Sequence, residues 1–135
     1  MNLGIFELFG KKKAQASGVF SLRAEVHPYS LKANTNDFVE LEIKLENTSD
    51  APQLTSIVVS VPPGLGFERS AISKQREVRL GFLKPGEVKF FKVPLWGTQR
   101  TPNGEYPLKI YALAHFNDYA HVLNEVRKVL HFRVD

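Results

Sequence analysis

The feature of this sequence that most constrains its fold is the alternation of apolar and polar side chains at every second position. Residues 38–45 show it most clearly, since Val39, Leu41, Ile43 and Leu45 alternate with polar, mainly charged residues. Side chains two apart along a strand point to the same face of the sheet. Such a segment buries one face and exposes the other, which is typical of antiparallel sheets rather than of parallel sheets covered on both sides.

The same period recurs along the chain, separated by turn signals rich in Gly, Pro, Asn and Asp. The segments predicted as strands are 19–26, 38–45, 57–61, 77–83, 88–96, 106–116 and 130–134. Turn signals about 8–12 residues apart are typical of a β-sandwich. The sequence therefore predicts an all-β fold with seven to eight antiparallel strands.

Two prolines and the apolar face of one predicted strand add detail to this prediction. Pro28 either ends the first strand or switches it from one sheet to the other. Pro94 has no N–H for a hydrogen-bond ladder, so it favours an edge position or a bulge for residues 88–96. One face of the strand 106–116 is predicted to enter the core with Leu108, Ile110, Ala112, Ala114 and Phe116.

The segment before the last strand, residues 119–130, fits the periodicity of a helix as well as that of a strand. Its apolar residues also recur at spacings of three and four, which is the pattern of a helix. A short helix before the final strand is therefore an alternative to a continuous strand.

Several turn motifs follow one another in a set order. They are residues 46–49 (ENTS), 59–65 (VSVPPGL), 80–87 (LGFLKPGE) and 104–108 (GEYPL). In this order they resemble the CARDB and NEW3-type immunoglobulin-like modules of archaeal and bacterial proteins, over residues 19–135. The resemblance implies an immunoglobulin-like sandwich with a role in adhesion, spacing or protein binding. Tyr106 looks like a tyrosine corner, whose hydroxyl bonds the backbone upstream.

Residues 1–17 differ in composition from residues 18–135, so we expect an N-terminal amphipathic, basic segment with a linker, followed by the sandwich domain. The segment combines apolar residues with a run of lysines: Leu3, Ile5, Phe6, Leu8, Phe9, Lys11, Lys12 and Lys13. Apolar burial beside basic charge is typical of a helix that lies on an anionic membrane surface. Two other interpretations remain: the segment docks on a protein partner, or it packs back onto the sandwich.

Composition excludes several classes of function. The chain has no cysteine, which removes disulfides, thiolate metal sites and cysteine nucleophiles. The net charge of +4 is spread along the chain, so nucleic-acid binding is not favoured. No secretory signal pattern or apolar run of about 20 residues occurs, so we expect a cytoplasmic protein that can associate with a membrane surface.

Candidate sites for chemistry are few. His115, Asp118 and His121 are weak metal candidates around a predicted turn, because imidazole and carboxylate groups bind divalent ions. No fourth ligand is evident, and a polar turn explains the same residues. No nucleophile elbow or phosphate-binding loop is present. Asn47-Thr48-Ser49 matches a glycosylation sequon but is better explained as a turn. We expect no cofactor and no enzymatic activity.

Tyr111 and Leu113 lie opposite the predicted core face of their strand, and Val129 can join them from the last strand. An exposed aromatic and aliphatic patch on a sheet is typical of a partner or dimer surface. The sequence therefore predicts a non-catalytic interaction module that uses its sheet face, its loops and the N-terminal segment to bind an unidentified protein or a second copy. The alternatives are a peripheral membrane protein anchored by residues 3–13, and a ligand- or metal-binding domain at the 115–121 turn.

Overall fold

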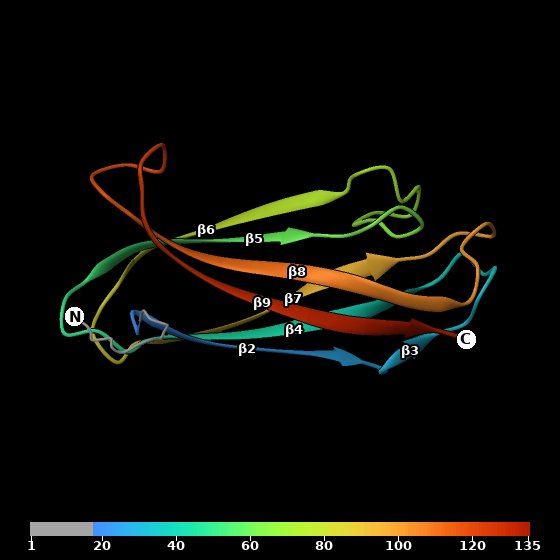
Figure 1. Ribbon diagram of the computed structural model, residues 1–135, viewed down its shortest axis with the longest axis horizontal. Coiled ribbons are helices and arrows are strands. Elements are labelled where there is room, and N and C mark those ends of the chain that lie inside the picture. The colour runs from blue at the N-terminus through green and yellow to red at the C-terminus, as the bar shows by residue number, and fades with distance from the viewer. Residues whose placement is uncertain (1–17) are drawn as a thin grey trace.

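Residues 18–135, which the computed structural model describes, form eight strands in two facing layers (Figure 1). The strands are β2 (Phe20–His27), β3 (Ser30–Leu31), β4 (Phe38–Asn47), β5 (Gln53–Ser60), β6 (Gln75–Leu83), β7 (Val88–Trp96), β8 (Gly104–His115) and β9 (Val122–Val134). The predicted all-β sandwich is confirmed. The interpretations of residues 1–17 fall outside the described residues and stay predictions.

One layer is a three-stranded sheet in the order β2-β4-β7, and the other is a five-stranded sheet in the order β3-β9-β8-β5-β6. All neighbours are antiparallel except β3 and β9. The chain changes sheets between β2 and β3, at the cis bond that precedes Pro28, as one of the two predictions for this proline requires. The strand that contains Pro94, β7, lies at a sheet edge, which confirms that prediction.

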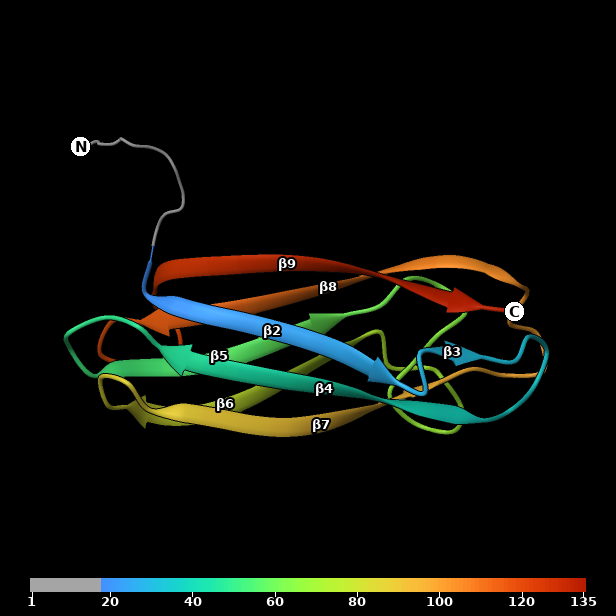
Figure 2. The ribbon, with the colours of Figure 1, turned by 90° about the horizontal axis from the view of Figure 1, so that it is seen from below.

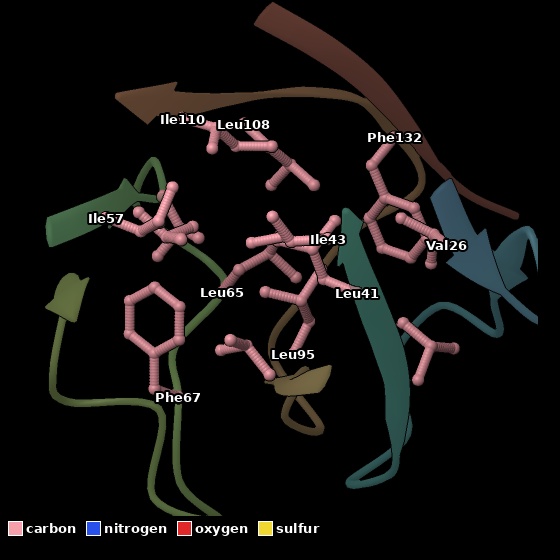
Figure 3. Close-up of a cluster of buried hydrophobic side chains, with 14 of the residues drawn as sticks. Val26, Leu41, Ile43, Ile57, Leu65, Phe67, Leu95, Leu108, Ile110 and Phe132 are labelled. Atoms are coloured by element: carbon pink, nitrogen blue, oxygen red, sulfur yellow. The ribbon is translucent and has the colours of Figure 1, made fainter. Parts of the chain in front are cut away.

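The core lies between the two sheets (Figure 3). The four apolar residues of β4, from Val39 to Leu45, are each at most 2% exposed, because they all point toward the five-stranded sheet. Phe67 enters the same cluster from the loop between β5 and β6, and Phe132 enters it from β9. Burial of this kind stabilises a domain by about 25 cal/mol for each Å² of apolar surface removed from water.

The helix alternative for residues 119–130 is wrong, because β9 begins at Val122 and pairs with β8 along its whole length. A helix would have buried Val122 and Val129 together, whereas both are exposed in the strand. The prediction for Phe116 is also wrong, since its side chain is 58% exposed. A register shift between Ala114 and His115 ends the alternation just before it.

At each side of the sandwich, an edge of one sheet lies next to an edge of the other. Figure 2 shows β2 and β9 side by side along one edge of the sandwich, where they contact each other without pairing. The opposite edge carries β6 and β7. At the start of β8, the Tyr106 hydroxyl donates to the carbonyl oxygen of Pro102 at 2.6 Å, four residues upstream, which is the contact of a tyrosine corner.

Candidate interaction surface

The outer face of the three-stranded sheet carries ion pairs beside the exposed apolar residues Phe38, Val88 and Phe90. The ammonium group of Lys92 lies 3.8 Å from both Glu40 and Glu42, and His27 lies 3.7 Å from Glu42. Exposed ion pairs of this kind contribute at most about 1 kcal/mol, and each group is also solvated. This face therefore presents a mixed, water-compatible surface.

The outer face of the five-stranded sheet also combines apolar and charged residues. Ile110, Ala112 and Ala114 of β8 face the core, so Tyr111 and Leu113 between them face outward, both half-buried. Residues on neighbouring strands that lie directly opposite share a face. Tyr111 is opposite Val58 of β5 and Arg127 of β9, Leu113 is opposite Glu125, and Lys109 is opposite Val129. The structure thus places Tyr111, Leu113 and Val129 on one surface, with charged residues among them.

The exposed apolar side chains are concentrated at β9 and the hairpin that leads into it. Ten large apolar residues in the described part of the chain are more than a third exposed, and four of them fall between residues 116 and 129. These are Phe116, Val122, Leu123 and Val129. We call these four residues, with the neighbouring Tyr111 and Leu113, the β9 surface.

Three members of the β9 surface are not predicted from the sequence, namely Phe116, Val122 and Leu123. The only signal available was a pair of adjacent apolar residues, Val122 and Leu123, which breaks the period of two. In the structure this pair lies at a bulge, where β9 has one more residue than β8. Both side chains remain exposed as a result.

The three weak metal candidates do not converge. The ring of His115 is buried, and its Nε2 shares a hydrogen bond of 2.7 Å with the Ser56 hydroxyl. Asp118 and His121 instead pair with each other at 2.7 Å on the exposed tip of the hairpin. Among residues 18–135, no group of three such side chains is arranged to hold a metal ion. The bulge after Ala114 and the turn that follows separate His115 from the other two residues.

Tyr119 fixes the hairpin tip against the neighbouring strands. Its hydroxyl accepts a hydrogen bond of 3.0 Å from the Gly81 amide on β6, and the Arg79 guanidinium lies 4.6 Å from its ring centre. The His115 ring contacts Tyr119 edge-on at 5.0 Å. These contacts tie residues 116–121 to the edge strand of the same sheet, so the β9 surface is presented on a rigid support.

We expect Ser56→Ala to lower the free energy of unfolding by about 1–3 kcal/mol, because it leaves the buried Nε2 of His115 without a partner. In the described chain the other ring nitrogen, Nδ1, already makes no hydrogen bond. The double variant Ser56→Ala/His115→Phe should recover most of the loss, since an apolar pair of similar shape has no polar group to satisfy. Urea denaturation of both variants checks this, and an unchanged single variant would contradict it.

The hairpin tip should respond to acid through Asp118. A hydrogen bond from the His121 ring, with another from the Ala120 amide, holds the pKa of this carboxyl below its usual value. Because the pKa is lower in the folded state, ionised Asp118 contributes to the free energy of unfolding. This contribution is complete above the unfolded pKa of about 3.9 and is lost as the pH falls through the folded pKa. Carboxyl NMR titration should give an Asp118 midpoint below about 3.9, and His121→Ala should raise it. A wild-type midpoint at or above the unfolded value would refute this.

A concave region lies at the end of the sandwich opposite the hairpin tip, and it is open and polar. It is lined by Asn36, Ser70, Thr98, Gln99 and Arg100. The Asn36 amide already donates to the carbonyl oxygens of Arg69 and Gly97, both at 3.0 Å. This arrangement holds the loops together, and it offers no apolar wall that would enclose a ligand.

Within residues 18–135 no helix has the length and apolar character needed to cross a bilayer. The membrane interpretation rests on residues 3–13, which the structure does not describe.

Comparison with solved structures identifies the fold class. The chain is similar to a segment of Escherichia coli alpha-2-macroglobulin that runs from domain MG7 to the C-terminus, with 15% identity and a TM-score of 0.60. The match covers 89% of this chain and 17% of the other, so this chain spans a small part of that protein. No protein-family model matches the sequence, and no curated protein matches it.

Two further structures align along nearly their whole length. A FixG-related protein from Vibrio parahaemolyticus is 11% identical over 87% of this chain and 98% of its own, with a TM-score of 0.51. BslA, a bacterial hydrophobin, is 15% identical over 89% and 96%, with a TM-score of 0.50. At such identities the likeness concerns the fold alone, and with the strand order it establishes an immunoglobulin-like β-sandwich.

Proposed function

We propose that this chain is a non-catalytic protein-interaction module that binds its partner through the β9 surface. The observation that carries the proposal is the concentration of exposed apolar residues between positions 116 and 129. Large exposed apolar patches on soluble proteins mark interaction sites. Of the other six exposed large apolar residues, Phe38, Val88 and Phe90 lie on the outer face of β4 and β7, and Tyr29, Ile72 and Phe82 lie on other segments.

The composition of the β9 surface suits a specific contact. Tyr111 supplies an aromatic ring, and Glu125 and Arg127 lie beside the apolar residues on the same face. Protein interfaces commonly combine an apolar or aromatic centre with a polar rim that fixes the orientation of the partner. The support is rigid, because β9 pairs along β8 and Tyr119 ties the hairpin tip to β6.

The polar residues of the chain support a non-catalytic role. The one buried serine–histidine pair places the Ser56 hydroxyl at 0% exposure, where no substrate reaches it. A serine nucleophile needs an accessible hydroxyl and a third group that orients the histidine. His115 has no such orienting group within the described chain, since its second ring nitrogen makes no hydrogen bond.

The order of turn motifs supports a closer assignment within this class. We propose that the chain is a module of the CARDB or NEW3 type, because residues 59–65 and 80–87 reproduce the turns that flank the strands of such modules. Binding, adhesion and spacing are the roles that this resemblance implies, and they agree with an exposed surface on a rigid sandwich.

Site-specific photo-crosslinking tests the interaction. Leu123 on the β9 surface and Phe90 on β7 are both 59% exposed, so they form a matched pair of positions for a crosslinking side chain. With the full chain in extract of the cells that make it, we expect a discrete protein adduct from position 123 and none from position 90. Equal adducts from both positions, or none from position 123, would rule the proposal out.

A further inference from the structure

The outer side of β9 is an unpaired strand edge over most of its length. β9 runs from Val122 to Val134, and β3 pairs with its outer side only at Arg133 and Val134. No other strand of the described chain pairs with this side between residues 122 and 131. A long unpaired edge exposes backbone donors and acceptors that can pair with a strand of another chain.

The charges on β9 select one way of pairing it with a copy of itself. In a symmetric antiparallel pair, the two-fold axis passes between the two copies of one residue. The residue before it in one copy then lies opposite the residue after it in the other copy. An axis at Val126 places Glu125 of each copy opposite Arg127 of the other. Both of these residues lie on the outer face, because they are opposite Leu113 and Tyr111 on β8.

Axes at residues 125, 127 and 128 are less favourable because they bring like charges together, and an axis at 124 runs into the bulge at Val122 and Leu123. An axis at residue 125 places Glu125 against its own copy, and axes at 127 and 128 do the same for Arg127 and Lys128. Like charges directly opposite each other destabilise a sheet. An axis shifted by half a residue would set outer-face residues against inner-face ones. The register centred on Val126 avoids both faults and places the inner-face residues Asn124 and Lys128 opposite each other.

The same register also fits the limits of the free edge. Regular pairing about Val126 extends from residue 124 to residue 128, so it lies between the bulge at Val122 and Leu123 and the β3 contact at residue 133. Leu123 of one copy comes near Val129 of the other, which covers exposed apolar side chains of the β9 surface at both ends of the contact. Removing such side chains from water favours association.

We propose that two copies of this chain join through β9, antiparallel about an axis at Val126, so that their five-stranded sheets become continuous. This inference rests on the proposed function and names a second copy as the partner of the β9 surface. The contact is isologous, because each copy contributes the same residues. Two Glu125–Arg127 ion pairs set its register.

Charge exchange tests the contact. Light scattering of the full chain over a range of concentrations should give the mass of a dimer. Glu125→Arg places arginine against Arg127 and should weaken dimerisation at least tenfold, and Glu125→Arg/Arg127→Glu should restore it because both pairs are reversed. The matched control is Glu77→Arg on the edge strand β6, where Glu77 pairs with Arg79 at 3.3 Å, and it should leave the mass unchanged.

The outcomes separate this inference from the proposed function. A monomer at all concentrations, a dimer insensitive to Glu125→Arg, or a double variant that stays dissociated would each overturn the dimer. If the chain is monomeric while position 123 crosslinks a different protein, the proposed function stands and the dimer fails. If position 123 crosslinks nothing, both fail.

Discussion

Replacing Asn47 with aspartate is expected to lower the free energy of unfolding by about 3–5 kcal/mol, the cost of an uncompensated buried charge. Asn47 is the last residue of β4 and is 0% exposed. Both the nitrogen and the oxygen of its side-chain amide form hydrogen bonds. The amide nitrogen donates to the carbonyl oxygens of Ala51 and Leu83, each at 2.9 Å, while the oxygen accepts from the amide and hydroxyl of Ser49 at 2.9 and 2.6 Å.

Aspartate keeps the acceptor and loses both donor bonds. The two carbonyl oxygens would then face a carboxylate oxygen, so repulsion adds to the loss of their partners. Because Asn47 joins the turn after β4 to the end of β6, the damage should spread to both layers of the sandwich. The same bonds confirm that Asn47-Thr48-Ser49 is a turn, because the nitrogen that would carry a glycan is buried and occupied.

Urea denaturation followed by the fluorescence of the single tryptophan measures this loss. Asn103→Asp in the exposed turn before β8 is the control, and it should change stability by no more than about 0.5 kcal/mol. A loss below about 1 kcal/mol for Asn47→Asp would mean that the hydrogen bonds of its side chain contribute little beyond an ordinary one.

The parts of the fold that sequence predicts well are those set by local rules. The period of two in residues 38–45 is enough to place Val39 and Leu41 in the core, because a strand allows only two directions for its side chains. Pro94 indicates an edge because it lacks a donor, which no tertiary contact can restore. The outward placement of Tyr111 and Leu113 follows from the same parity.

The hairpin tip is different because it depends on contacts between distant residues. β8 ends at His115, so Phe116 lies outside its period of two, and only the adjacent pair Val122 and Leu123 indicates where the extra residue of β9 lies. His115 is buried because Ser56, 59 positions earlier in the chain, pairs with it. Tyr119 is placed by the amide of Gly81. The spacing of His115, Asp118 and His121 suggests a metal site, whereas these contacts hold His115 away from the other two.

β9 has an exposed part and a buried part along its length. Residues 122–129 are mostly exposed and present the β9 surface. Phe132 and Val134, further along, are buried in the core. Surface substitutions in the first part are expected to change stability by no more than about 0.5 kcal/mol. Changes in the second part should act on stability.

Phe132→Ala is expected to lower the free energy of unfolding by about 3–5 kcal/mol, the usual cost of emptying a buried phenylalanine site. The Phe132 ring is 2% exposed and extends from β9 toward Val26 on β2 in the other sheet (Figure 3). Removing it leaves a cavity where the two layers meet beside the sandwich edge. Phe132→Leu should cost less, about 1–2 kcal/mol, because most of the volume is kept.

Phe90→Ala provides the matched control, because that ring is 59% exposed on β7 and its removal should change stability by no more than about 0.5 kcal/mol. Urea denaturation should give a lower midpoint with an unchanged slope for Phe132→Ala, since the surface exposed on unfolding stays nearly the same. A loss below about 2 kcal/mol would mean that β2 and β9 close over the vacated site. In that case the edge formed by these two strands would rearrange readily. A β9 contact with a second copy would then have to hold the two strands in one arrangement.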